Sequence, residues 1–220
     1  MERHFDEELK ELQENILKLG SLAIEAISGS VKALQNNDKK LAQQIINADN
    51  RIDELELIID EKCIDLLALY QPMAADLRFI TTGLKLNAEI ERIGDLAVDV
   101  AQRVIELADK PMLKPLLDIP QLSDVAQKMV REAIDSFIKR DITLAAKVIK
   151  TDNQADELKN RISAELINDY MSKDPSTATR AVSLLLIARH LERICDHASN
   201  IAEDVYYMVK GKIIRHHHEQ

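Results

Sequence analysis

Nine acidic side chains stand in four groups along this sequence, with a spacing of four residues inside each group. The groups are Asp49 with Asp53, then Glu91 with Asp95 and Asp99, then Asp152 with Asp156, and finally Glu192 with Asp196. Residues four apart lie above one another on an α-helix, so each group predicts a row of carboxylates along one helix face.

Two interpretations of these rows remain open on spacing alone. The usual one is a solvated acidic face opposite an apolar stripe. The other is that rows from two helices of each half converge and bind hard cations. Like charges four apart destabilise a helix by about 0.2–0.5 kcal/mol per pair, and a merely solvated face intersperses lysines more often. Oxygen-only ligands suit Mg²⁺, Mn²⁺, Ca²⁺ or iron better than zinc.

Long helices must position these rows, because the composition favours helix over sheet. The 220 residues include 5 Gly, 5 Pro, 4 Tyr, 3 Phe and no Trp, whereas sheet proteins need more turn residues and aromatics. Apolar residues recur at helical spacing, and the pattern breaks at residues 36–38, 71–72, 109–120, 139–141 and 173–175. These breaks predict six helices.

The third and sixth predicted helices carry the apolar seam of a helix bundle. On the third, residues 74–108, the seam is Leu86, Ile90, Ile93, Ala97, Val100 and Val104. On the sixth it is Leu184, Ile187, Leu191, Ile194, Ala198, Ile201, Val205 and Met208. At about 100° per residue the acidic rows centre about 180° from these seams, so we expect the rows to point away from the core.

The net charge and the cysteines exclude several classes of protein. A formal charge of −9 argues against a nucleic-acid binder, because such affinity comes from Lys and Arg. No segment approaches the ~18 consecutive apolar residues of a membrane span, and the acidic start lacks the order of a secretory signal. We therefore expect a cytoplasmic protein. Cys63 and Cys195 stand singly, which predicts neither a zinc site nor a disulfide.

The two halves of the chain repeat each other. Residues 49–55 match residues 152–158 at five of seven positions, and ERIGDLAVD from Glu91 matches ERICDHASN from Glu192. We predict an all-α fold of two tandem three-helix bundles related by internal duplication: residues 1–110, a linker 111–120, residues 121–212, and a basic, disordered tail 213–220. A single antiparallel helical array without domain division is the alternative.

Arg92 and Arg193 follow the first Glu of each ERI-x-D core. Together with Arg78 and Arg180 they either form an anion site or, by the more ordinary interpretation, pair with neighbouring carboxylates or orient metal ligands. His190 and His197 flank the second-half row and are weaker ligand candidates, since seven residues are two helical turns.

The chain resembles the PhoU family over nearly its whole length. The residues responsible are QPMAADLRFI from Gln71, the two ERI-x-D cores, and YYMVKGKIIRH from Tyr206. The resemblance implies two three-helix bundles whose acidic rows hold metal clusters, commonly iron or zinc, although Mg²⁺ or Mn²⁺ also suits the ligands. One departure is Asn200, which stands where the first half has Asp99. The second site is therefore one charge poorer unless Glu203 is an extra ligand.

The resemblance also implies a function. It predicts a cytoplasmic negative regulator of phosphate uptake and of the phosphate-starvation response, often a homodimer. Such a regulator acts as an adaptor between the ATPase subunit of the phosphate ABC transporter and the phosphate-sensing histidine kinase, and reaches the membrane only through these partners.

A carboxylate-bridged metalloenzyme and a structural helical oligomer are the alternative functions. Di-iron bundle enzymes project Glu and Glu-x-x-His pairs into the bundle core, whereas here the rows lie opposite the seam and no His follows three residues after Glu89. Nucleotide-binding and nucleophile motifs are absent. We therefore expect no catalytic turnover.

Overall fold

The computed structural model describes residues 2–211, and these residues form helices without a strand. The helices are α1 (Glu2–Asn36), α2 (Lys39–Ala48), α3 (Asn50–Tyr70), α4 (Ala74–Ala108), α5 (Asp118–Lys139), α6 (Ile142–Glu165) and α7 (Ala178–Lys210). A π-helical turn (Leu166–Met171) and a 3₁₀ turn (Pro175–Thr177) connect α6 to α7. The predicted all-α fold is confirmed. The predicted tail 213–220 lies outside the described residues.

The predicted breaks coincide with the ends of the helices, with two differences. The second predicted helix is divided at Asp49 into α2 and α3. The non-helical linker spans residues 109–117 and ends before Pro120, which lies inside the first turn of α5. Proline is tolerated there because the first N–H groups of a helix have no partner within it.

The same local turn begins the second helix of each half. Asn37 and Arg140 both have φ 52°, a left-handed conformation that ends a helix. The next residue is an aspartate that caps the following helix. Asp38 accepts hydrogen bonds from the N–H groups two and three residues ahead, both at 3.0 Å, and Asp141 does the same at 2.8 and 3.1 Å. The repeat therefore extends to the turns.

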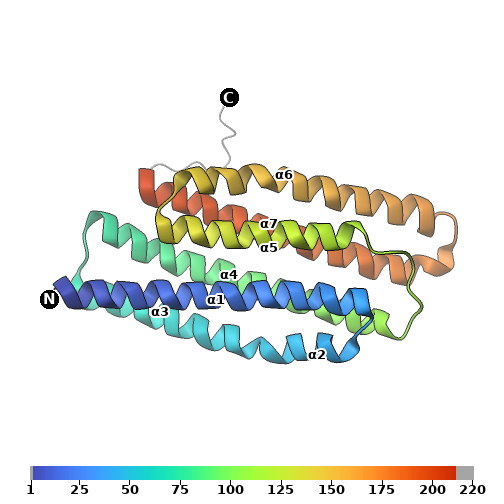
Figure 1. Cartoon of the computed structure of the whole chain (residues 1–220), viewed down its shortest axis with the longest axis horizontal. Coiled ribbons are helices and arrows are strands. Elements are labelled where there is room, and N and C mark those ends of the chain that lie inside the picture. Colours follow the sequence, from blue (N-terminus) through green and yellow to red (C-terminus); the bar gives the residue numbers. More distant parts are fainter. Residues whose placement is uncertain (1, 212–220) are drawn as a thin grey trace.

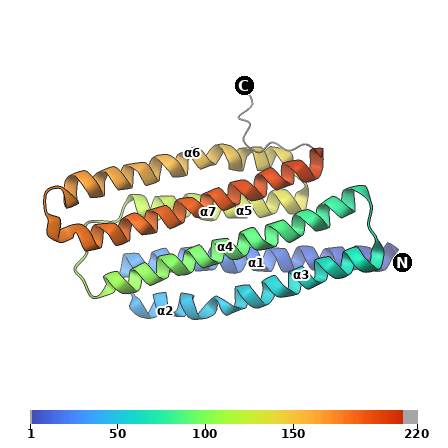
Figure 2. The same cartoon turned by 180° about the vertical axis from the view of Figure 1, so that it is seen from behind.

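Four helices form the centre of the molecule. Helix α4 packs along α7, and α1 packs against α5. Helices α2 and α3 cover α1 and α4 on one side, and α6 covers α5 and α7 on the other, as the elongated bundle in Figures 1 and 2 shows. Each acidic row on α4 or α7 thus has a neighbouring outer helix.

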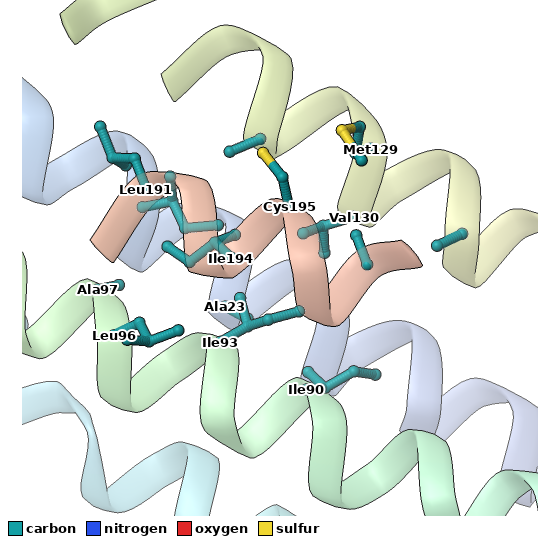
Figure 3. Packing of buried hydrophobic residues seen from close by; sticks show 14 of the residues in the cluster. Ala23, Ile90, Ile93, Leu96, Ala97, Met129, Val130, Leu191, Ile194 and Cys195 are labelled. Carbon is teal, nitrogen blue, oxygen red and sulfur yellow. The ribbon is translucent and has the colours of Figure 1, made fainter. Parts of the chain in front are cut away.

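Both repeats contribute to one hydrophobic core. Every residue of the two predicted seams on α4 and α7 is buried. Figure 3 shows Ala23 of α1, Ile93 of α4, Val130 of α5 and Ile194 of α7 converging between the helices. The duplication is therefore clear in the sequence and topology, while the packing joins the two bundles along their length.

Candidate metal centres

The acidic rows of the first half meet where α2 and α3 lie against α4. Asp49 stands at the junction of α2 and α3, close to Gly94 of α4. A Cβ atom placed on Gly94 would lie 3.7 Å from Asp49 Oδ1 and 2.9 Å from Ile52 Cδ1. The missing side chain of Gly94 therefore lets the two acidic segments approach each other.

The carboxylates of the two segments are close enough to influence one another's pKa values. Burial raises the pKa of Asp49 to about 6, and the negative charges of Asp53 and Asp95 add to this shift. The pKa of Glu91 is also raised, first by burial and then by Asp95, with Arg92 acting in the opposite direction. Repulsion between carboxylates disfavours their charged forms. The row on α4 thus faces a second acidic segment.

Glu56, Asp60 and Asn87 extend this site and were missed in the sequence analysis. Burial, together with Asp60 and Asp53, raises the pKa of Glu56. The buried Asn87 donates from Nδ2 to Asp60 Oδ1 and to the backbone oxygen of Glu56, both at 2.8 Å. Glu56 and Asp60 are four residues apart, so the spacing rule already used for the other rows would have found them.

We call the six carboxylates on this side the first acidic cluster. They are Asp49, Asp53, Glu56, Asp60, Glu91 and Asp95. Arg92 lies at its rim: Nη1 is 2.9 Å from Asp95 Oδ2, Nε is 3.6 Å from Glu91 Oε2, and the side chain is 64% exposed. The guanidinium therefore pairs with its neighbours on α4 and leaves the acidic rows facing each other.

The second acidic cluster lies between α6 and α7. It contains Asp152, Asp156, Glu192 and Asp196. Burial raises the pKa of Asp152 to about 6, and the negative charges of Asp196 and Asp156 add to this shift. Cys195 takes the place of Gly94, and burial next to these carboxylates raises the pKa of its thiol. The thiol points toward α5 in Figure 3 and stays protonated.

Lys159 distinguishes the second cluster from the first. Its Nζ atom is 3.1 Å from Glu192 Oε1 and 3.4 Å from Asp156 Oδ1. The hydrogen bond to Glu192 is the largest cause of the raised pKa of Lys159. An ammonium group therefore already bridges the two helices that carry the second acidic rows.

Asp99 and Asn200 lie at the contact between the repeats. His190 Nδ1 of α7 is 3.6 Å from Asp99 Oδ2, and Asn200 Nδ2 donates to Glu89 Oε2 of α4 at 3.3 Å. His197 Nδ1 is 2.6 Å from the same Glu89 oxygen. Because an α-helix turns by slightly more than a full circle in four residues, the third member of the α4 row has rotated toward α7.

Two further predicted residues, Arg193 and Glu203, also lie on α7. Arg193 is exposed on α7, and Glu203 is partly buried further along the same helix. Within residues 2–211, no three His, Cys, Asp or Glu side chains stand in a ready ligating arrangement. A metal ion would therefore need the facing carboxylates to turn toward it, and its charge would offset the repulsion between them.

Comparison with known proteins matches both halves to one family. The model of the PhoU domain matches residues 16–104 and 119–205. A phosphate-specific transport system accessory protein PhoU homolog of Aquifex aeolicus is 42% identical over 211 residues, covering 96% of this chain and 95% of that protein. The homolog of Pseudomonas aeruginosa is 38% identical over 215 residues, covering 97% and 88%.

Solved structures agree with these matches. The crystal structure of PhoU from Pseudomonas aeruginosa has a TM-score of 0.89 at 38% identity, covering 94% of this chain and 100% of that one. The phosphate transport system regulatory protein PhoU from Streptococcus pneumoniae has a TM-score of 0.88 at 30% identity, covering 95% and 98%. Among the described residues, no helix is both long and apolar enough to cross a bilayer.

Proposed function

The chain belongs to the PhoU family, and on that premise we propose that it is an accessory regulator of phosphate transport. The observation that carries this proposal is the match of both repeats, over nearly the whole chain, to relatives named as accessory proteins of the phosphate-specific transport system. Its role is then to hold phosphate uptake and the phosphate-starvation response low when phosphate is sufficient, as a cytoplasmic adaptor without catalytic turnover.

Deletion of the gene in the native host tests this role. We expect phosphate-starvation genes to be expressed in phosphate-rich medium, and the full chain supplied in trans to restore their repression. A deletion strain with normal repression would contradict the proposal. Phosphoester hydrolysis by the pure protein, above a metal-stripped control and lost in Asp95→Ala, would instead favour the metalloenzyme.

We further propose that the first acidic cluster binds metal. Asp49 and Asp53 from one side and Glu91 and Asp95 from the other supply oxygen ligands, with Glu56 next to them. The set suits hard cations such as Mn²⁺, Mg²⁺ or iron better than zinc. A bound cation would neutralise the facing carboxylates, and the side chains around it would link the α2–α3 junction to α4. Elemental analysis of protein purified without chelator or affinity tag tests this directly.

An adaptor needs a surface that a partner can cover, and the exposed side of α3 offers one. The α3 face consists of Leu57, Ile58, Ile64 and Leu69, interspersed with Glu54, Glu61 and Asp65, all exposed. Leu57 is 66% and Leu69 is 74% exposed. Apolar side chains in one exposed strip are typical of interaction sites.

The charges on the α3 face favour a partner with a basic rim. Its three carboxylates fit an apolar surface rimmed by Lys or Arg, whereas a second copy of this chain would place like charges against each other. We propose that this surface belongs to the ATPase subunit of the phosphate transporter, because the relatives are named for that transport system.

Binding of the purified ATPase subunit to the full chain tests this assignment. The variant Leu57→Ser with Ile64→Ser should weaken binding about tenfold or more, since buried apolar anchors dominate interface energy. Ile167→Ser is the matched control, because Ile167 is the exposed second-half equivalent of Ile64. Equal binding of the ATPase subunit by wild type and both variants would contradict the assignment. It would also be contradicted if Leu57→Ser with Ile64→Ser lost self-association but still bound the ATPase subunit normally.

A further inference from the structure

We infer that Lys159 is a built-in cation that keeps metal out of the second acidic cluster, so that only the first half of the chain binds metal. This inference rests on the proposed metal binding of the first cluster. The two acidic clusters occupy equivalent places in the two repeats, and we infer that one binds metal and the other excludes it.

The contacts of Lys159 are those expected of such a cation. Its ammonium group lies between α6 and α7, at 3.1 Å from Glu192 Oε1 and 3.4 Å from Asp156 Oδ1. Both Lys159 and Glu192 are largely covered by the protein. The pair with Glu192 is therefore screened less by salt than an exposed pair, whereas Asp156 is 54% exposed.

The equivalent position in the first half carries the opposite charge. The spacing of 103 residues that relates Asp49 to Asp152 also relates Glu56 to Lys159. Two neighbours differ as well: the carboxylate of Asp60 is replaced by Ser163, and the hydrogen-bonding amide of Asn87 is replaced by Ala188. The first cluster thus has six carboxylates with the exposed Arg92 at its rim, whereas the second has four carboxylates with an ammonium group between two of them.

A metal ion in the second cluster would compete with this ammonium group. A divalent cation held by Glu192 and Asp156 would stand next to the positive charge of Lys159, and the two repel each other. If Lys159 moved away, its ammonium would give up both carboxylate partners, which opposes the exchange. The residues of the second cluster therefore do not fit a metal ion as those of the first cluster do.

Manganese binding to the full-length chain tests the inference, since the electron paramagnetic resonance signal of free Mn²⁺ falls as the ion binds. The first-half site is emptied with Glu91→Gln and Asp95→Asn. We expect the second cluster of this variant to bind no Mn²⁺. Adding Glu192→Gln and Asp196→Asn should therefore leave its remaining Mn²⁺ binding unchanged. Adding Lys159→Glu to the emptied variant should create a site at least tenfold tighter than in its parent.

The reciprocal change uses the same charge in the other half. Glu56→Lys in the otherwise native chain should weaken Mn²⁺ binding at least tenfold. Lys159→Met removes the charge and keeps the length and the apolar stem of the side chain. Its melting curve without metal shows whether the protein still folds, so that a change in Mn²⁺ binding can be attributed to the lost charge.

The outcomes distinguish this inference from the proposed metal function. Tight Mn²⁺ binding by the emptied variant, lost with Glu192→Gln and Asp196→Asn, would overturn the inference and leave metal binding intact. A wild-type chain that binds no Mn²⁺, together with a Lys159→Glu chain that binds it, would support the role of Lys159 and overturn first-half binding. No binding by either chain would overturn both.

Discussion

The two acidic clusters are built on the same frame and differ in what stands between their helices. On the first side, the helix breaks at Asp49, and Gly94 lets the broken segment approach α4. On the second side, α6 continues through Asp152, and Cys195 fills the position of Gly94. The duplicated caps and seams preserve the backbone arrangement, so single substitutions can change the charge inside the cluster while the fold stays the same.

The outer faces of the two halves also differ, because the face in the first half is more apolar. Leu57 and Ile58 of the α3 face correspond to Asn160 and Arg161 of α6. Arg161 is itself engaged, because its guanidinium donates to both carboxylate oxygens of Asp118 at 2.9 and 3.0 Å. The first half therefore combines the more negative cluster with the more apolar surface, and we expect it to carry most of the binding activity.

Metal removal should give the largest difference between the halves. A cation at about 100 times its dissociation constant stabilises the protein by about 2.7 kcal/mol, or about 5–10 °C for a chain of this size. Chelator should lower the melting temperature of the wild type by that amount and leave Glu91→Gln with Asp95→Asn unchanged. Differential scanning calorimetry measures both. If chelator leaves the melting temperature of the wild type unchanged, the solvated-face interpretation is favoured.

Closing the gap at Gly94 should give the next largest effect. A methyl group there would lie 2.9 Å from Ile52 Cδ1, whereas at Gly83 the nearest atom is 3.6 Å away. We expect Gly94→Ala to lower the free energy of unfolding by about 1–2 kcal/mol because of overpacking. Gly83→Ala is the control and should raise it by about 0.5–1 kcal/mol. Urea unfolding distinguishes them, and equal effects would show that the α3–α4 contact is not tight.

The pH dependence of metal-free stability should follow Asp49 and Asp152. The folded-state pKa of each is about 6, above the ordinary value of 3.8, so the folded state holds these protons more tightly. Their stabilising contribution is complete below pH 4 and is lost as the pH rises through 6. Because both groups are partly solvated, we expect about 1 kcal/mol in total, or about 2–4 °C.

A double variant isolates that contribution. In the presence of chelator, the melting temperature of the wild type should fall more between pH 5 and pH 7 than that of Asp49→Asn with Asp152→Asn. Parallel profiles would mean that the carboxylates are well solvated and that the clusters are more open than the structure places them.

Removing Arg92 should have the smallest effect. Its pairs with Glu91 and Asp95 are exposed, and such pairs contribute about 0–1 kcal/mol. Arg92→Ala should change the melting temperature by no more than about 1–2 °C, and the exposed Arg193 provides the matched Arg193→Ala control. A much larger loss for Arg92→Ala, without metal, would show that the first cluster depends on this cation.

Much of the fold followed from local patterns. The α4 and α7 seams, the turns near Asp38 and Asp141, and the span of α4 were all predicted, because periodicity and capping act within a few residues. The break at Asp49 was not predicted, since no proline or glycine marks it. Pro120 was misread as a break because proline in the first helical turn leaves the helix intact.

The site was predicted only in part. Glu56 and Asp60 were overlooked although their spacing is that of the other rows. Asp99 was grouped with Glu91 and Asp95, but the structure turns it toward His190. The angle through which a row rotates along its own helix follows from the sequence. Which neighbouring helix the row then faces does not follow from the sequence.

The sequence by itself determined the helices, the duplication, the family and the face on which each carboxylate lies, since these depend on residue type and on spacing along one chain segment. Only the tertiary structure decided which groups meet across helices. Asp49 faces Asp95, whereas Lys159 lies 3.1 Å from Glu192. The partners in each pair are more than 30 residues apart in the sequence, so no local pattern of spacing predicts their contact. It also decided that the two repeats share one core, because packing energy depends on which apolar faces are brought together and not on where the repeat divides the chain.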